Sequence, residues 1–198
     1  MLNIVTAYTR KENIPIIYSS IFNQTDNFNW YIIEGSNTNL GNPDYEFIKN
    51  DSRVKYYKIE TKYTFGYEQR NFFMKNIKCE DDDWCYFLDD DNTITWDLID
   101  VTNNEELTTD IILFSQKVGL SEKIRLYGYE DRLTLGNCDI GSFAIRYRVA
   151  KNTEINDYIR NGDGHYCEYL NSLKGTHNIK FYPDKFVRYN TLSLRYND

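Results

Sequence analysis

The sequence predicts a single α/β domain built on a mostly parallel sheet. Segments with strand character alternate along the first half of the chain with segments whose apolar residues recur at helical spacing. A length of 198 residues is enough to bury one core but short for two domains. Hydrophobic residues make up 41% and charged residues 27%, and 18 Tyr and 11 Phe supply bulky core side chains. One folded unit with one cleft is therefore expected.

The first half of the chain supplies the regular part of this pattern. Strands are predicted at residues 2–7, 30–33, 54–59 and 84–88, and helices at residues 13–22 and 67–77. Pro15 lies near the start of the first helix, where proline is favoured because the first helical N–H groups have no partner. Asn and Gly crowd residues 35–42, which predicts a loop, and a short helical stretch leads from it to the third strand.

The second half of the chain is more mixed. A helix is predicted at residues 95–101, strands at residues 111–118 and 142–148, and helices at residues 154–160 and 166–173. No internal repeat, linker or low-complexity tract interrupts these segments. In a sheet of this class, ligands bind beyond the carboxyl ends of the parallel strands. Candidate site residues are therefore sought directly after the apolar strands.

Charge and composition exclude several classes of protein. A formal net charge of −7 argues against broad binding to nucleic acid, which needs a basic face. No window approaches the roughly 18 apolar residues that span a bilayer, and the first residues lack the layout of a signal peptide, so a cytoplasmic location in a bacterium or a virus-infected host is expected. The four cysteines form no Cys-x-x-Cys pair and are expected to be reduced, without zinc.

Three adjacent aspartates, Asp89-Asp90-Asp91, follow the apolar strand at residues 84–88. Adjacent carboxylates repel one another, and at the end of a buried strand they destabilise the fold unless a cation or hydrogen-bond donors compensate. Mg²⁺ and Mn²⁺ prefer such oxygen ligands and share their remaining positions with water and substrate phosphates. The acidic run at residues 80–83 follows no apolar strand and is expected to be a solvated loop.

The aspartates have two other interpretations. The spacing excludes an EF-hand, because Thr93 and Ile94 stand where a fifth-position oxygen ligand and a glycine are required. The structural alternative is a helix N-terminus, with Asn92 or Thr93 as the capping residue.

Gly66-Tyr67-Glu68-Gln69-Arg70-Asn71, followed by Tyr86-Phe87-Leu88-Asp89-Asp90-Asp91-Asn92-Thr93, resembles the donor site of the glucuronosyltransferases of glycosyltransferase family 43. The similarity continues at residues 4–10, 30–34, 139–144 and 166–170. It implies the GT-A fold, a single Rossmann-like α/β domain with a mixed sheet. Residues 1–92 would form the nucleotide-binding half and residues 93–198 the acceptor-binding half.

The activity implied by this resemblance is a metal-dependent, inverting sugar transfer. The donor would be a nucleotide-diphosphate sugar, with a UDP-sugar favoured, the acceptor a glycan or glycoprotein, and the cofactor Mn²⁺ or Mg²⁺. Glu168 would deprotonate the acceptor hydroxyl, which would then attack the anomeric carbon and displace the diphosphate. The resemblance assigns the remaining residues as follows: Asp91 to the metal, Asp89, Asp90, Thr6, Tyr8, Arg10, Glu34 and Arg70 to the nucleotide, and Asp139 to the acceptor.

The sequence departs from the family at two places. Gly35, after Glu34, stands where the family has an acidic residue that reads uracil, so the base stays open. Asn190 stands where a phosphate-binding histidine is expected, and Arg188 or Arg195 is the substitute that the sequence offers. The donor sugar, the linkage and the oligomeric state are likewise left open.

Three alternatives to this assignment remain. Asp163, in the turn Asn161-Gly162-Asp163-Gly164, is a competing base, although Asp-Gly pairs are common in turns for backbone reasons alone. A nucleotidyltransferase would use a similar sheet, but residues 6–10 lack its Gly-rich loop. A non-catalytic module that binds nucleotides or carbohydrates is the third. In any of these proteins, exposed side chains among Tyr56, Tyr57, Tyr63 and Tyr67 are candidates for stacking on sugars.

Overall fold

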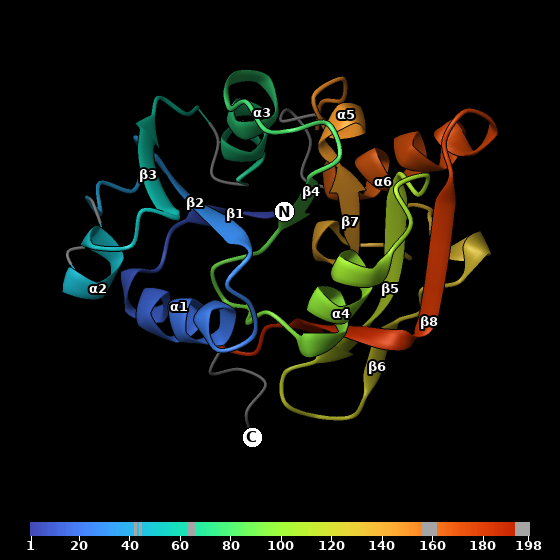
Figure 1. Ribbon diagram of the computed structural model, residues 1–198, viewed down its shortest axis with the longest axis horizontal. Helices are drawn as coiled ribbons and strands as arrows, with labels where there is room; N and C mark the ends of the chain where they lie inside the picture. Colours follow the sequence, from blue (N-terminus) through green and yellow to red (C-terminus); the bar gives the residue numbers. More distant parts are fainter. Residues whose placement is uncertain (42, 44, 63–65, 156–161, 193–198) are drawn as a thin grey trace.

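A central sheet of eight strands, covered by helices on both faces, organises the protein in the computed structural model (Figure 1), which describes residues 1–41, 43, 45–62, 66–155 and 162–192. The strand order is β3-β2-β1-β4-β7-β5-β6, and β8 pairs with β5. Because β8 pairs with every residue of β5, β6 and β7 share the other edge of β5. The predicted α/β class with a mixed sheet is confirmed.

The first half of the chain folds as the alternating pattern predicts. Its elements are β1 (Leu2–Tyr8), α1 (Ile14–Phe22), β2 (Phe28–Gly35), α2 (Glu46–Lys49), β3 (Val54–Ile59), α3 (Tyr67–Asn76) and β4 (Trp84–Phe87). The four strands are parallel, and each predicted strand and helix in this half is confirmed to within a few residues. The carboxyl ends of β1 and β4 therefore meet at one edge of the sheet, where the three aspartates begin.

The second half supplies the antiparallel pairs of the sheet and one further parallel pair, β5 with β8. Its elements are α4 (Trp96–Asn104), β5 (Ile111–Val118), β6 (Ile124–Leu126), β7 (Phe143–Arg146), α5 (Tyr147–Ala150), α6 (Gly162–Ser172) and β8 (Ile179–Tyr189). The strand predicted at 142–148 is too long, because the chain turns into α5 where the Tyr147 amide donates to the Asp83 carbonyl. The helix predicted at 154–160 lies mostly outside the described residues. In the part of the chain described, no helix has the length and apolarity to cross a membrane.

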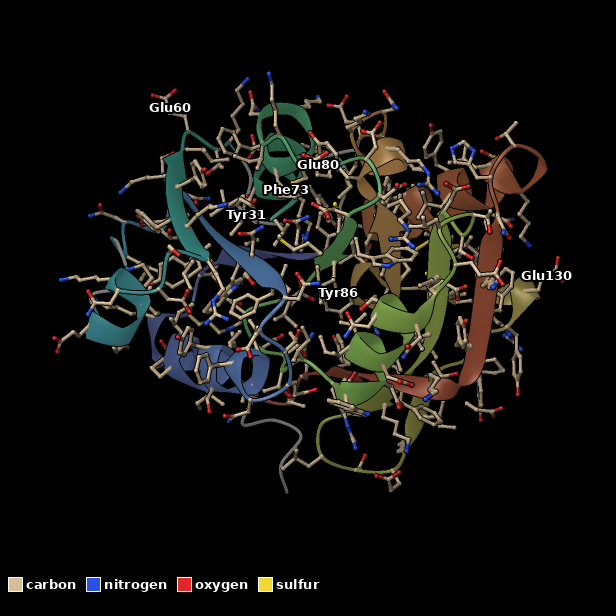
Figure 2. The ribbon with its side chains drawn as sticks, viewed as in Figure 1. Tyr31, Glu60, Phe73, Glu80, Tyr86 and Glu130 are labelled. Atoms are coloured by element: carbon tan, nitrogen blue, oxygen red, sulfur yellow. The ribbon has the colours of Figure 1, made fainter. Side chains whose placement is uncertain are left out.

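The two faces of the sheet bury separate cores, as the alternation of side chains along each strand requires. In β1, Ile4 and Tyr8 face α1 and α4, whereas Val5 faces α3 and α6. On the α3 face, the Tyr31 and Phe73 rings meet edge to face with centroids 4.9 Å apart. Figure 2 shows Tyr31, Phe73 and Tyr86 inside the molecule, with Glu60 and Glu130 at its periphery.

The strand β8 was not predicted, and its local sequence explains why. Pro183 and Asp184 interrupt the alternation, and residues 183–185 leave the register between the pairs Phe114–Tyr182 and Ser115–Phe186. The Ser115 hydroxyl donates to the Pro183 carbonyl at 2.8 Å, which satisfies the interrupted backbone. The strand is therefore held by long-range pairing with β5 that no local pattern reveals.

Glu105, just after α4, ties β8 to the rest of the fold. Its buried carboxylate accepts hydrogen bonds from the Lys180 ammonium at 2.6 Å and from the Tyr182 hydroxyl. Burial alone raises the pKa of Glu105, but the hydrogen bonds from Lys180, Tyr182 and Thr109 prevail and lower it to about 2. The folded state therefore strongly prefers the ionised carboxylate.

Replacing Glu105 by Gln is expected to lower the free energy of unfolding at pH 7 by about 2 kcal/mol, because charge-assisted hydrogen bonds are lost in a buried position. The contribution of Glu105 is fully present above its ordinary pKa and is lost as the pH falls towards about 2. Urea denaturation at several pH values measures both effects. Glu106→Gln is the matched control, since that side chain is 73% exposed and lies 3.9 Å from Lys180; an equal loss in the control would contradict the assignment.

Candidate functional site

A pocket of about 220 Å³ opens at the carboxyl ends of β1 and β4. The residues that line it come from the loops after these strands, from the start of α3 and from the chain after β8: Ala7, Thr9, Arg10, Gly66, Arg70, Asp89, Asp90, Asp91, Tyr189 and Asn190. Three carboxylates and two guanidinium groups thus line one small cavity. The predicted position of the aspartates beyond the strand end is confirmed.

Asp90 is the structural member of the triplet. Its carboxylate accepts hydrogen bonds from the Thr9 amide at 2.5 Å, from the Thr9 hydroxyl at 2.8 Å and from the Arg10 guanidinium. Its carbonyl accepts from the Asn13 side-chain amide at 2.8 Å. Asp90 therefore fixes the loop between β1 and α1 and holds Arg10 at the pocket.

The aspartates do not cap a helix. The next helix, α4, begins at Trp96, and its capping position is occupied by Thr95, which makes no side-chain capping bond. Asn92 instead accepts a hydrogen bond from the Asn190 amide, and the Thr93 amide donates to the Thr191 hydroxyl at 2.9 Å. The capping interpretation is wrong because residues 92 and 93 anchor the chain that follows β8.

Asp89 pairs with Arg70, which α3 presents from its first turn. The Arg70 guanidinium is almost fully buried and donates to the Asp89 carboxylate. Burial raises the pKa of Asp89 to about 7; Arg70 acts in the opposite direction, and Asp139 and Asp91 add to the rise. One guanidinium is therefore not enough to compensate the negative charge of the pocket.

Gly66 allows α3 to start against β1. It adopts φ +78°, and a Cβ there would lie 2.8 Å from the Ala7 Cβ and 3.0 Å from the Arg70 Nη1. The conformation and the close approach both exclude a side chain. The Gly66-x-x-x-Arg70 spacing is thus a structural requirement for the arginine's position.

Gly66→Ala is expected to lower the free energy of unfolding by more than Gly136→Ala does. Both glycines have positive φ, so each alanine costs about 1–2 kcal/mol in the backbone, but a Cβ at Gly136 meets nothing within 4 Å. The excess for Gly66 measures the clash with Ala7 and Arg70. Chemical denaturation of the two variants tests this, and equal losses would show that Arg70 adjusts freely.

Asp91 is the member of the triplet with the weakest contact to a cation of the protein. The Arg10 guanidinium lies 3.5 Å from its carboxylate, which is longer than an ordinary charge-assisted hydrogen bond. Burial raises its pKa, Arg10 opposes this, and Asp90 and Asp139 contribute to the rise. The ionised carboxylates of Asp89 and Asp91 are therefore undercompensated by the protein itself.

These oxygen donors fit a hard divalent cation that is shared with a substrate. Within the described residues, no three His, Cys, Asp or Glu side chains converge to hold a metal by themselves. Mg²⁺ and Mn²⁺ commonly bind through one or two carboxylates and complete their shells with water and substrate phosphates. Asp91, with Asp89 beside it, fits that requirement, while Arg10 and Arg70 supply donors for phosphate oxygens.

The chain after β8 closes one wall of the pocket. The Leu192 amide donates to the Asp91 carbonyl at 2.8 Å, and Asn190, with φ +55°, lines the cavity. Arg188 is not available as the expected substitute for a histidine, because its guanidinium donates to the carbonyls of Gly119 and Ser121. Arg195 lies outside the described residues. The basic groups at this pocket are Arg10 and Arg70.

Three predicted nucleotide contacts lie outside the pocket lining. Thr6 is buried, and its hydroxyl accepts from the Trp30 indole N–H at 3.0 Å. Glu34 is buried and accepts from the Gly41 amide at 3.0 Å and from the Tyr56 hydroxyl. Tyr8 is fully buried, and among the described residues its hydroxyl has no hydrogen-bond partner. Thr6 and Tyr8 face the α1 side of the sheet, as the even-numbered residues of β1 do, and Glu34 is bonded to the loop after β2. The three side chains therefore support the layer behind the pocket.

A second pocket, also of about 220 Å³, lies beside the first on the α6 side of the molecule and contains Asp139, Arg125 and Asp163. Asp139 accepts from the Gly141 amide and from the Arg125 guanidinium, each at 3.0 Å. Its charge raises the pKa of Asp89, Asp91 and Asp163, in each case after the larger effect of burial. Asp139 is therefore the electrostatic link between the two pockets.

Asp163 enters this second pocket from the first turn of α6. The Tyr67 hydroxyl donates to its carboxylate at 3.5 Å, and the Tyr67 ring lies under the Arg70 guanidinium. Burial raises the pKa of Asp163, Asp139 adds to the rise, and Arg70 opposes it. The turn interpretation of Asp163 is incomplete, because the residue begins a helix and faces other ionisable groups.

Glu168 lies elsewhere on the same helix. Its side chain is 47% exposed, it pairs with His165 at 3.2 Å, and it lines neither pocket. Five residues after Asp163, it points about 140° away around the helix. The structure therefore does not bring Glu168 to the cluster that contains Asp89, Asp139 and Asp163.

Two residues of these pockets, Arg125 and Tyr189, carry no signal in the sequence that points to a site. Arg125 follows no motif and lies in β6, a strand too short to be predicted. Tyr189 lies in the unpredicted β8 and stacks under the Arg125 guanidinium at 3.8 Å. The predicted sugar-stacking role for Tyr67 is wrong, because the ring is buried, and Tyr63 lies outside the described residues.

Comparison with known proteins identifies the fold. No family model and no curated protein sequence matches the chain. Residues 1–349 of S. aureus TarS in complex with UDP match with a TM-score of 0.66 and 17% identity, over 96% of this chain and 57% of that one. The mannosyltransferase PcManGT from Pyrobaculum calidifontis, in complex with GDP-Man and Mn²⁺, matches with a TM-score of 0.67 and 14% identity, over 98% and 58%. The chain has the GT-A fold.

The GT-A fold accommodates more than one activity among the matched proteins. A putative glucose-1-phosphate thymidylyltransferase from Bacillus anthracis matches with a TM-score of 0.53 and 11% identity, over 92% of this chain and 88% of that one. The chain spans little more than half the length of TarS residues 1–349 and of PcManGT. The likeness to family 43 stays a prediction, since these structures do not distinguish among families of the fold.

Proposed function

We propose that the protein is a metal-dependent glycosyltransferase that moves a sugar from a nucleotide-diphosphate donor, with a UDP-sugar favoured, to a glycan or glycoprotein acceptor. The observation that carries the proposal is the pocket at the end of β4, where Asp89 and Asp91 face Arg10 and Arg70 in a GT-A fold. In this proposal residues 1–92 bind most of the nucleotide, and residues 93–198 bind the acceptor.

The donor would lie with its diphosphate between the two arginines. Arg10 is held by Asp90 and Arg70 by Asp89, so both guanidinium groups are positioned before the ligand arrives. Asp91, with Asp89, would hold Mn²⁺ or Mg²⁺, which supplies charge that stabilises a departing diphosphate. Thr6, Tyr8 and Glu34 would act behind the pocket, by positioning the loops that surround the nucleoside.

The second pocket would receive the acceptor. Asp139 offers carboxylate oxygens to sugar hydroxyls, and Arg125 offers guanidinium N–H groups. A base removes the acceptor proton while the acceptor oxygen bonds to the anomeric carbon; the bond from that carbon to the diphosphate breaks, and its electron pair leaves with the diphosphate. A single displacement of this kind inverts the anomeric configuration.

Asp163 is the base that the geometry favours over Glu168. It lies in the same pocket as Asp139 and near Arg70, and its pKa is raised, which strengthens it as a proton acceptor. Glu168 is exposed and bound to His165. The general-base role that the sequence resemblance implies for Glu168 therefore passes, in this proposal, to Asp163.

Thermal stabilisation by UDP, GDP, CDP and dTDP, each with and without Mn²⁺, tests the proposal. A ligand that binds only the folded state raises the melting temperature. We expect one nucleotide to stabilise the protein only with Mn²⁺, and the corresponding nucleotide-sugar to be consumed when acceptors are present. Strong nucleotide binding without turnover of any donor would favour the non-catalytic module, and no stabilisation by any nucleotide would contradict the proposal.

A nucleotidyltransferase is the second candidate, favoured by the likeness to the thymidylyltransferase over 88% of that chain. Such an enzyme joins a nucleoside triphosphate to a sugar phosphate and releases pyrophosphate, whereas sugar transfer releases a nucleoside diphosphate. The loop at residues 6–10 lacks the glycines that would let the backbone approach a triphosphate. Analysis of the released product by ion-exchange chromatography separates the two activities.

A further inference from the structure

We propose that the acceptor is an extended glycan chain, and that Tyr127 and Tyr129 bind one of its units at a distance from the reacting sugar. The inference rests on the proposed function and deepens it, because it names the class of acceptor. Three observations support it: two stacked tyrosines are exposed, the segment that carries them continues from Arg125 in the second pocket, and a backbone contact holds that segment in place.

Tyr127 and Tyr129 form an exposed aromatic pair. Their side chains are 43% and 48% exposed, and their rings stack with centroids 5.6 Å apart and an angle of 11° between planes. Few large aromatic side chains on the described surface are this exposed, and among them only Tyr127 and Tyr129 stack on each other. The pair is therefore preorganised as a rigid aromatic surface, which loses little side-chain entropy when a ligand binds.

The segment that carries the pair is fixed to the sheet by Gly128. Its amide donates to the Ser115 hydroxyl at 2.9 Å, and a Cβ at this position would lie 2.7 Å from the Phe114 carbonyl carbon. Gly128 is buried while Tyr127 and Tyr129 on either side of it are exposed. The close approach to β5 thus directs both rings outward.

The aromatic pair continues a strip that begins at the proposed donor pocket. Tyr189 lines that pocket, and Arg125 lies over the Tyr189 ring at 3.8 Å. Arg125 in turn lines the second pocket. Along this segment every second residue, namely Arg125, Tyr127 and Tyr129, is exposed, so the three side chains share one side of the chain. From Arg125 to Tyr129 an extended chain covers about 13 Å, which exceeds the length of a single sugar ring.

The chemistry of the strip suits a saccharide. One face of a pyranose ring presents C–H groups that pack on an aromatic ring, while its hydroxyls need hydrogen-bond partners at the edges. The exposed aromatic surface of Tyr127 and Tyr129 supplies the apolar partner, and Arg125, Asp139 and Asp163 supply polar partners in the adjoining pocket. An acceptor with several linked sugars would fill both places at once, whereas a monosaccharide would fill only the pocket.

Isothermal titration calorimetry in the presence of UDP and Mn²⁺ tests the inference. The probes are cellotetraose, chitotetraose and mannotetraose, each compared with its monosaccharide. For at least one pair we expect the tetrasaccharide to bind at least about tenfold more tightly, and the Tyr127→Ala/Tyr129→Ala variant to lose that advantage. Tyr169→Ala is the matched control, since Tyr169 is 42% exposed on α6 and lies outside both pockets, and it should keep the advantage.

The other outcomes overturn the inference. They are the absence of any tetrasaccharide advantage in the unsubstituted protein, an advantage that survives the double substitution, and a change in oligomeric state caused by that substitution, which would make the pair a contact between copies. Stabilisation by UDP and Mn²⁺, measured on the same samples, separates this result from the proposed function. If it is present while the tetrasaccharide advantage is missing, only the extended-acceptor inference fails.

Discussion

Asp91→Asn is expected to abolish stabilisation by nucleotide and Mn²⁺ and to reduce sugar transfer by about 10³-fold, since metal stabilisation of the leaving group is worth several kcal/mol. The ligand-free variant should unfold at a higher temperature than the unsubstituted protein. Burial raises the pKa of Asp91, with Arg10 opposing and Asp90 adding to the rise, so the ionised carboxylate destabilises the ligand-free fold at neutral pH. Differential scanning fluorimetry with and without ligand measures both changes.

The opposite signs of these two effects make the result specific. A residue that only stabilises the fold would lower the melting temperature when replaced, whereas a ligand-holding carboxylate raises it and removes the ligand response. Asp26→Asn is the matched control, because it makes the same chemical change at a side chain that is 93% exposed, just before β2 and therefore at the other end of the strands. A ligand-free variant of Asp91 that is less stable, or one that keeps the metal-dependent response, would contradict the assignment.

Asp163→Asn is expected to lower kcat by about 10²–10⁴-fold, the range that general-base catalysis contributes. Stabilisation by nucleotide and Mn²⁺ should persist, because Asp163 lines the second pocket and not the first. Steady-state kinetics on the donor and acceptor identified for the enzyme, together with fluorimetry, measure the two effects separately. The expected result is thus loss of turnover without loss of donor binding.

The pH dependence supplies an independent test of Asp163. A base acts only when it is deprotonated, and burial, with a further contribution from Asp139, raises the pKa of Asp163. The rate should therefore fall as the pH drops, and the fall should begin at a higher pH than an exposed aspartate would give. Glu168→Gln is the control on the same helix and should keep kcat within about twofold, as surface substitutions away from a site usually have small effects. A large loss with Glu168→Gln, and none with Asp163→Asn, would return the role of base to Glu168.

The sequence predictions that the structure confirms most fully are the strands and helices with a regular local pattern of apolar residues. Continuous apolar segments and helical spacing predicted β1 to β4 and α1 to α3, because the parallel part of the sheet buries both faces of each strand. The position of Asp89 to Asp91 after such a strand predicted the pocket, since the topology brings strand ends together. The acidic run at residues 80–83 was predicted to be a solvated loop; residues 80–82 are exposed, whereas Asp83 is half-buried and pairs with the amino terminus at 3.0 Å.

The sequence by itself therefore determined the α/β class, the parallel half of the sheet and the edge at which the aspartates gather, because each depends on local periodicity and chain order. Only the tertiary structure decided which carboxylates the protein itself provides with hydrogen-bond donors. Asp90 is turned towards Thr9 and Arg10, whereas the Asp91 carboxylate has a longer contact, of 3.5 Å, with Arg10. The position of Asp163 on α6 brings it, and not Glu168, into the pocket of Asp139. Arg125 and Tyr189 join the site through the long-range pairing of β6 and β8 with β5. Such pairings arise from the packing of distant segments, and local sequence carries little information about them.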